Sequence, residues 1–224
     1  MENLWLILVA LVAYLLGSIP TAYLLSGKKI LEGGSGNVGA MNTFRVTGSL
    51  KPLVLTLFID AAKGATAVAA SRWWLLGLGY NAGLGVMTAS FFVVAGHNYS
   101  VILKFLVGEF KGGRGLASLM GVLLVLNWIL PFLCLGVVIL AIIGTEYGMK
   151  RRIEQGFRKL FSVVGSQILG RVIGLVICLI PIYFLLPKEL FPTFPLLLIL
   201  PAALLSYWAH FDRLRKYLEG IKKN

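Results

Sequence analysis

The chain has 224 residues, of which 58% are hydrophobic and only 13% charged, and its mean hydropathy is +0.87. An average soluble domain carries about 25% charged residues, so a soluble fold of this length could not cover its apolar surface. The net charge of +12 raises the question of nucleic acid. No nucleic acid partner is expected, because the basic residues cluster between apolar stretches, as in membrane proteins.

Seven apolar segments fit helices that cross a bilayer. They span residues 4–26, 52–70, 78–97, 115–128, 131–148, 161–186 and 194–210. The fourth and fifth come from one apolar stretch that we divide at Asn127-Trp128 and Pro131. The sixth contains Pro181, which predicts a tilted or broken helix. We therefore expect an all-α integral membrane protein with a single domain over residues 1–224.

Basic residues are divided unequally between the two sides of this arrangement. With the N-terminus outside, 17 of the 21 lysines and arginines fall on the cytoplasmic side, and two, Arg72 and Lys188, fall outside. Such an excess marks the cytoplasmic side, so the C-terminus is expected in the cytoplasm. The first segment lacks a basic n-region and is long for a signal peptide, so it should remain as a membrane helix. Two glycine-rich runs, at 33–39 and 108–115, then lie on the cytoplasmic face.

The first run, GGSGNVGAMN (33–42), contains the pattern G-x-G-x-x-G in Gly34, Gly36 and Gly39. A dinucleotide turn needs a preceding strand, and a membrane helix stands there instead. A flexible linker is one alternative. The other is an anion-binding nest of backbone amides, supplemented by neutral donors and by one guanidinium. The candidate side chains for that nest are Ser35, Asn37, Asn42, Thr43 and Arg45.

The second run, GHNYSVILKFLVGEFKGGRG (96–115), has similar chemistry. Its basic residues Lys104, Lys111 and Arg114 surround the glycines Gly112, Gly113 and Gly115. If Gly115 begins the next helix, free amides and the positive end of the helix dipole face the turn. The alternative is that the basic residues only anchor helix ends. Two such loops on one membrane face favour a composite anion site.

Three titratable residues lie close to these loops in sequence. His97 ends the third span, where it could cap or pack the helix or could transfer a proton. Asp60 and Lys63 lie three residues apart inside the second span. Charges within a membrane are costly and face the interior, so we expect a neutralised pair that supports the site. No convincing metal-ligand set occurs in the sequence, so no metal is expected, and any acyl transfer would proceed without a conventional nucleophile triad.

Together these residues resemble a known family. The segments GSIP (17–20), GSGNVGAMNTFR (34–45), IDAAKGA (59–65) and GHNYSVILKF…KGGRG (96–115) are similar to the bacterial acyl-phosphate:glycerol-3-phosphate acyltransferases, the PlsY family, over about the first 120 residues. The resemblance implies a seven-helix enzyme of the bacterial inner membrane whose active site faces the cytoplasm. It would transfer a fatty acyl group from acyl phosphate to the 1-hydroxyl of glycerol 3-phosphate, giving lysophosphatidate without acyl-CoA, metal or cofactor.

The resemblance also implies roles for individual residues. The hydroxyl proton would pass to His97 or to a phosphate oxygen of the substrate. The expected catalytic residues are Ser35, Arg45, His97 and Lys104. The expected substrate-binding residues are Gly34, Gly36, Asn37, Gly39, Asn42, Thr43, Lys111, Gly112, Gly113, Arg114, Gly115 and His210.

The chain departs from the family pattern at four places. Met41 replaces a threonine, residues 106–110 (LVGEF) resemble an insertion, and the basic connection 148–160, expected to touch anionic membrane lipid, is longer. The C-terminal motif is altered to AHFDRLRKYLEGIK (209–222), where His210 and Gly220 match. These departures leave two alternatives open: a divergent paralogue with another acceptor, or a small anion or lipid transporter.

Overall fold

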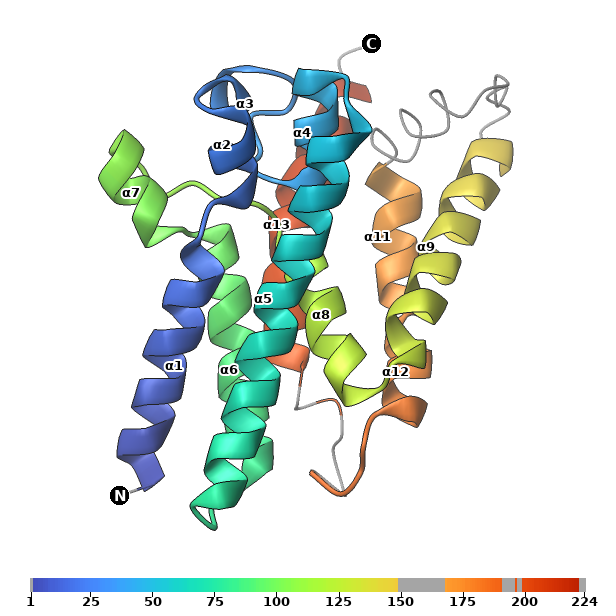
Figure 1. The fold of residues 1–224 in the computed structure, drawn as a ribbon. Helices are drawn as coiled ribbons and strands as arrows, with labels where there is room; N and C mark the ends of the chain where they lie inside the picture. The colour runs from blue at the N-terminus through green and yellow to red at the C-terminus, as the bar shows by residue number, and fades with distance from the viewer. Residues whose placement is uncertain (1, 149–167, 191–195, 197–198, 222–224) are drawn as a thin grey trace.

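A computed structural model describes residues 2–148, 168–190, 196 and 199–221, and these ranges are almost entirely helical (Figure 1). The described part contains no strand, only one isolated antiparallel bridge between Ser100 and Lys111. The helices are α1 (Glu2–Ser18), α2 (Thr21–Ser26), α3 (Lys29–Glu32), α4 (Ala40–Thr47), α5 (Leu50–Gly77), α6 (Ala82–Asn98), α7 (Val101–Val107), α8 (Leu116–Leu126), α9 (Ile129–Gly148), α11 (Ile168–Ile177), α12 (Leu179–Leu185) and α13 (Leu200–Ile221).

Each predicted apolar segment contains helix in its described part, but residues 19–20, 78–81 and 127–128 are not helical. The fourth and fifth segments are separate helices, because α8 ends at Leu126 and α9 begins at Ile129. The sixth is broken at Cys178, between α11 and α12, and the basic stretch 149–159 lies outside the described residues. Helix α5 runs past the predicted end at residue 70 to Gly77, because Ser71 and Arg72 are compatible with helix although they are polar. The short helices α3, α4 and α7 were not predicted.

The helices approach one another closely at glycines. A Cβ atom on Gly17 of α1 would stand 2.1 Å from the carbonyl oxygen of Val93 in α6, and one on Gly96 would stand 2.1 Å from that of Tyr14. Helices α5 and α8 cross in the same way, since a Cβ on Gly64 would lie 1.9 Å from the Ser118 oxygen. Small residues of this kind let membrane helices pack backbone against backbone. The position of α6 and α8, which flank the second glycine run, therefore depends on glycine contacts.

The first apolar segment is bent where α1 gives way to α2. Pro20 cannot continue the hydrogen-bond ladder, so carbonyl groups near the break need other partners. The Ser100 hydroxyl donates to the carbonyl of Ser18 at 2.5 Å, and the Lys63 ammonium donates to that of Ile19 at 2.5 Å. Side chains from two other segments thus hold the bend in place.

The two ends of the bundle differ in character. Among the described residues, two helical stretches, Asn3–Ser26 and Leu50–Gly77, are by length and composition able to cross a membrane. At the lower end in Figure 1, where α1 begins and α5 ends, Trp5 and Trp74 lie with ring centroids 5.5 Å apart. Tryptophan is typical of a membrane interface. Helices α2, α3 and α4 gather at the opposite end, and the polar loops lie with them.

Candidate active site

The first glycine run is a folded loop built around Asn42. This side chain is buried and accepts hydrogen bonds at Oδ1 from the Ser35 amide at 2.7 Å and the Ser35 hydroxyl at 3.1 Å. Its Nδ2 group donates to the carbonyls of Ile30 at 3.0 Å and Gly33 at 3.2 Å. These contacts use both amide hydrogens inside the protein. Asn42 therefore shapes the loop, and the run is not a flexible linker.

Glycine is needed in this loop for conformation and for space. Gly34 has a φ of +61°, and a Cβ there would stand 2.3 Å from Asn42 Oδ1. Gly36 has a φ of +64°. Both values lie in the left-handed region that other residues rarely adopt. Gly39 then precedes α4, and no side chain of the described residues caps the start of that helix.

The other predicted residues of the first loop differ in exposure. Thr43 is buried, and its hydroxyl donates to the carbonyl of Gly39 at 3.2 Å and lies 3.5 Å from the Thr56 hydroxyl. Ser35 and Arg45 are exposed, and Asn37 is half-buried. Thr43 consequently supports α4 from below, whereas Ser35, Asn37 and Arg45 remain accessible.

The two glycine runs touch directly. The Val38 amide of the first loop donates to the Gly112 carbonyl of the second at 3.1 Å, and the Gly113 amide donates to the His97 carbonyl at 2.9 Å. A Cβ on Gly112 would stand 2.2 Å from the His97 carbonyl oxygen and 2.5 Å from that of Asn98. Only glycine allows the second loop to lie this close to the end of α6. The predicted convergence of the two loops is therefore present in the structure.

His97 lies beneath this junction. Its side chain is buried, with Nδ1 at 3.3 Å from the Ser118 hydroxyl and 3.8 Å from Oδ1 of Asp60. The opposite nitrogen, Nε2, faces the glycine turn, because a Cβ on Gly113 would stand only 2.0 Å from it. The Nδ1 side of the imidazole thus faces the interior of the helical bundle, and the Nε2 side faces the loop junction.

Asp60 and Lys63 form the expected ion pair inside the bundle. Lys63 Nζ lies 2.6 Å from Asp60 Oδ1, and both side chains are about 3% exposed. Thr21 joins the pair, since its hydroxyl donates to Asp60 Oδ1 at 2.9 Å and accepts from Lys63 Nζ at 2.6 Å. A small cavity lies among Thr21, Asp60, His97 and the Gly112–Gly113 turn. Asp60 thus lines the cavity, and Lys63 supports it from the side.

Lys104 and Lys111 are held by the segment 106–110. Lys104 is exposed, and its ammonium donates to the Gly108 carbonyl at 2.6 Å and lies 5.7 Å from the centre of the Phe110 ring. Lys111 pairs with Glu109 at 3.0 Å on the surface. Each lysine is therefore engaged by residues of the apparent insertion. Any contact that they make with a substrate stays a prediction.

The start of α8 brings together polar groups that the sequence did not single out. Gly115 has a φ of +71°, and a Cβ there would stand 3.0 Å from both Asn98 Oδ1 and Ser206 Oγ. Both oxygens are buried and lack a hydrogen-bond partner within the described part of the chain. Arg114, the residue before Gly115, is half-buried. The helix start at Gly115, predicted from the sequence, is confirmed. In the sequence, only its position next to His97 pointed to Asn98, and no feature pointed to Ser206.

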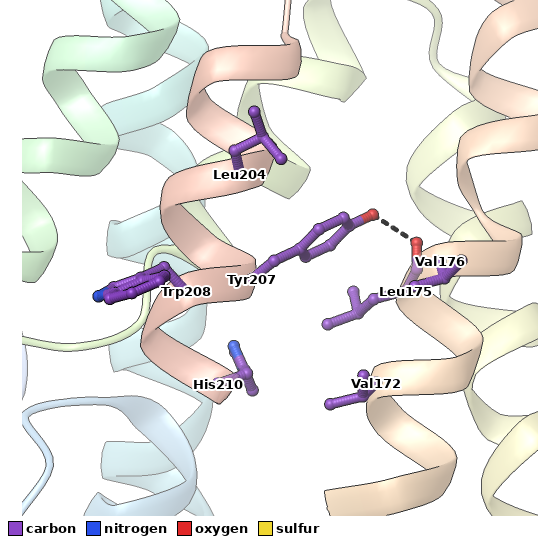
Figure 2. Close-up of a pocket in the computed structure, with 7 residues that line it drawn as sticks. All are labelled: Val172, Leu175, Val176, Leu204, Tyr207, Trp208 and His210. Atoms are coloured by element: carbon purple, nitrogen blue, oxygen red, sulfur yellow. Dashed lines mark hydrogen bonds between the residues drawn. The ribbon is translucent and has the colours of Figure 1, made fainter. Parts of the chain in front are cut away.

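His210 lies on α13, one turn after Ser206. It is buried, and its Nδ1 lies 2.8 Å from the Ser206 carbonyl. Figure 2 shows it at one end of a groove of about 480 Å³ between α11 and α13. The remaining lining is almost entirely apolar and consists of Val172, Leu175, Val176, Leu204, Tyr207 and Trp208. The Tyr207 hydroxyl donates to the Leu175 carbonyl across the groove. His210 therefore lines an apolar groove and does not belong to either glycine loop.

The fold and the site together define a class of protein. Apolar helices surround a buried ion pair, and two glycine loops meet above that pair at one end of the bundle. Among the described residues no group of three or more histidine, cysteine or acidic side chains is placed to hold a metal ion. This is a helical membrane protein with a polar site at one end of the bundle.

The family model for glycerol-3-phosphate acyltransferase matches residues 7–220. The chain belongs to this family, and it is an acyltransferase that acylates glycerol 3-phosphate.

Individual proteins agree with this assignment. The chain is 32% identical to the glycerol-3-phosphate acyltransferase of Clostridioides difficile over 82% of this chain and 89% of the relative. It is 46% identical to glycerol-3-phosphate acyltransferase 2 of Moorella thermoacetica over a shorter match, 54% of this chain and 58% of that protein. The fold is similar to the crystal structure of PlsY, an integral membrane glycerol 3-phosphate acyltransferase, in its glycerol 3-phosphate form. That match has a TM-score of 0.67 and 23% identity, and it covers 96% of this chain and 92% of the other.

Proposed function

We propose that the chain transfers a fatty acyl group from acyl phosphate to the 1-hydroxyl of glycerol 3-phosphate, at the cytoplasmic face of the bacterial inner membrane. The products are lysophosphatidate and inorganic phosphate. The observation that carries the proposal is the hydrogen bond from Val38 to Gly112, which joins two glycine loops into one surface. Both substrates carry a phosphate, and two adjoining loops can hold them side by side.

The proposed step needs no covalent enzyme intermediate, because acyl phosphate is already an activated mixed anhydride. The 1-hydroxyl oxygen attacks the acyl carbon, an ester bond forms, and the bond from that carbon to the phosphate oxygen breaks. The electron pair leaves with the phosphate. Catalysis then rests on positioning the two substrates and on stabilising the developing negative charge.

Separate groups serve the two phosphates in this proposal. Ser35, Asn37 and Arg45 bind one phosphate at the accessible side of the first loop, together with the amides that begin α4. Arg114 and the amides that begin α8 bind the other. The orphaned oxygens of Asn98 and Ser206 need hydrogen-bond donors, and glycerol hydroxyl groups are suitable donors.

The hydroxyl proton has two candidate acceptors. One is a phosphate oxygen of the substrate, and the other is Nε2 of His97, which faces the Gly112–Gly113 turn. The variant His97→Gln separates them, since a protein base contributes about 10²- to 10⁴-fold. A smaller loss of kcat assigns the proton to the phosphate.

We further propose that the acyl chain occupies the groove between α11 and α13 (Figure 2). Its volume of about 480 Å³ lies in the range of about 300 to 1,000 Å³ that is typical of small-molecule sites. Its lining is apolar apart from His210 at one end. His210 is one helical turn from Ser206, which adjoins Gly115. A chain in this groove would therefore run from the bilayer towards the loops.

The test uses purified protein, palmitoyl phosphate and labelled glycerol 3-phosphate, with lysophosphatidate as the readout. We expect product from the unaltered chain and a loss of at least 100-fold in kcat/KM for Arg45→Ala, because a charged phosphate partner is removed. Product formation with palmitoyl-CoA in place of palmitoyl phosphate would contradict the proposed donor. Consumption of palmitoyl phosphate with some other acceptor would contradict the proposed acceptor.

A further inference from the structure

One carboxylate lies behind the imidazole at the loop junction. Asp60 Oδ1 is 3.8 Å from His97 Nδ1, and the Ser118 hydroxyl is 3.3 Å from the same nitrogen. Asp60 and His97 come from different helices, α5 and α6, and Ser118 comes from α8. All three are buried. The inner face of the imidazole therefore has fixed polar surroundings.

Lys63 fixes the Asp60 carboxylate in this place. The ammonium makes three hydrogen bonds, to Asp60 Oδ1, the Thr21 hydroxyl and the Ile19 carbonyl. An ammonium group has three hydrogens, so Lys63 is fully used. It neutralises Asp60 and at the same time ties the pair to the bend between α1 and α2. The carboxylate consequently has little freedom to turn away from His97.

We propose that Asp60 is a positioning residue, which keeps Nδ1 of His97 protonated and so presents Nε2 as a hydrogen-bond acceptor at the junction of the two glycine loops. The tautomer of a histidine is set by the group that faces its other nitrogen. A lone pair on Nδ1 would face a carboxylate oxygen in a buried setting, where such repulsion is strong. A proton there is attracted by Asp60 and can be donated to the Ser118 hydroxyl.

The catalytic consequence rests on the proposed function. With Nε2 as an acceptor, the junction can take a hydrogen bond from a substrate hydroxyl. With the opposite tautomer, Nε2–H would be a donor and could not accept a hydrogen bond from that hydroxyl. The tautomer of His97 in the unbound protein does not depend on which substrate the protein takes.

The experiment measures the tautomer directly. The chain has two histidines, so ¹⁵N-histidine labelling of the protein in detergent gives two sets of imidazole signals. Signals that disappear in His97→Gln belong to His97. The ¹⁵N chemical shifts distinguish a protonated nitrogen from an unprotonated one. We expect His97 to be protonated at Nδ1 in the unaltered chain.

The decisive variant is Asp60→Asn combined with Lys63→Gln. It keeps the size of the Asp60 side chain, shortens the Lys63 side chain by one atom, and removes both charges together, because removing one alone would leave an unpaired buried charge. We expect a thermal midpoint that still indicates a folded protein and a shift of His97 towards the Nε2–H form. The control is Ser71→Ala, a buried polar change elsewhere on α5, which should leave the tautomer unchanged. An Nε2–H form in the unaltered chain, or an unchanged tautomer in the double variant, would overturn the proposal.

Kinetics provide the second measurement. The double variant should lose about 10- to 100-fold in kcat, which is the scale of a small misplacement at an active site, while its KM for glycerol 3-phosphate changes less than about threefold. An unchanged kcat would overturn the catalytic role. If the unaltered chain forms no lysophosphatidate, the proposed function fails, and the tautomer measurement still decides the positioning role. The two failures are therefore distinguishable.

Discussion

The amide of Val38 donates a hydrogen bond to the carbonyl of Gly112 at 3.1 Å, although the two residues belong to loops separated by α4, α5, α6 and α7. Both loops must keep their shape for this contact to form. Asn42 shapes the first from within, and Gly112 and Gly113 let the second lie against the end of α6. The contact between the two loops therefore depends on the packing of the helices that hold them.

Helix packing at glycine can be tested on α8. A Cβ on Gly121 would stand 1.8 Å from the Ala61 carbonyl oxygen, so Gly121→Ala must push α8 away from α5. We expect a loss of about 2 kcal/mol in stability, measured as a lower thermal midpoint in detergent. The matched control is Gly136→Ala on α9, where a Cβ meets nothing within 4 Å. Equal midpoints for the two variants would contradict close packing at Gly121.

Asn42 and Ser35 should respond differently to truncation. Asn42→Ala removes the partner of the Ser35 amide and of the Ile30 carbonyl, and it leaves the Gly33 carbonyl only the Gly36 amide, which should cost about 2 kcal/mol or more in unfolding free energy. Ser35→Ala removes an exposed hydroxyl, so stability should change by less than about 0.5 kcal/mol. The KM of the Ser35→Ala variant for glycerol 3-phosphate should rise about tenfold or more, because a hydrogen bond to the charged phosphate is lost. Thermal unfolding and KM together separate the structural role of Asn42 from the substrate-binding role of Ser35. An Asn42→Ala protein as stable as the unaltered chain would refute the structural role.

The segment 106–110 should weaken substrate binding slightly by engaging Lys111. Glu109→Gln frees the ammonium from its partner at 3.0 Å, and a surface pair contributes no more than about 1 kcal/mol. We expect KM for glycerol 3-phosphate to fall about twofold at low salt and the effect to shrink at high salt. Glu189→Gln, an exposed acid that follows α12, serves as the control for net charge. A twofold fall in the control as well would attribute the effect to overall charge.

Chain-length preference tests the groove between α11 and α13. Leu204 lines this groove, so Leu204→Trp should shorten the space available to an acyl chain. We expect the ratio of kcat/KM for octanoyl phosphate to that for palmitoyl phosphate to rise about tenfold, since each excluded methylene forfeits about 0.8 kcal/mol. Leu57→Trp, at an exposed position of α5, should leave the ratio unchanged. An unchanged ratio in Leu204→Trp would place the acyl chain elsewhere.

Much of the fold follows from local sequence properties. Apolar runs predicted the long helices, and Asn127 marked the break between α8 and α9, where its side chain now accepts from the Ile129 amide. The spacing of Asp60 and Lys63 on one helix face predicted their contact. The short helices α4 and α7 escaped prediction because each depends on contacts with other segments: Thr43 of α4 lies beside Thr56 of α5, and Leu103 of α7 packs in one cluster with Ala22 and Ile30. Helix ends were also misplaced where polar residues such as Arg72 continue a helix.

Site residues were harder to predict, because residue type does not show which partner a side chain will find. Asn42 has the chemistry of a phosphate ligand, yet its amide hydrogens are used inside the loop. Lys104 has the expected charge, yet its ammonium caps the end of α7 at Gly108. Ser206 reaches Gly115 only through the packing of α13. These assignments depend on contacts between distant segments, which local patterns do not contain.

The central claim is that the two glycine loops act as one site, and Gly112→Ala tests it most directly. The added Cβ would stand 2.2 Å from the His97 carbonyl oxygen, so the second loop must move away from Val38. The control is Gly77→Ala, where a Cβ meets nothing within 4 Å. We predict at least a 100-fold loss of kcat/KM for lysophosphatidate formation in Gly112→Ala, with a thermal midpoint that still indicates a folded protein and with full activity in Gly77→Ala. Equal activity in the two variants would contradict the account.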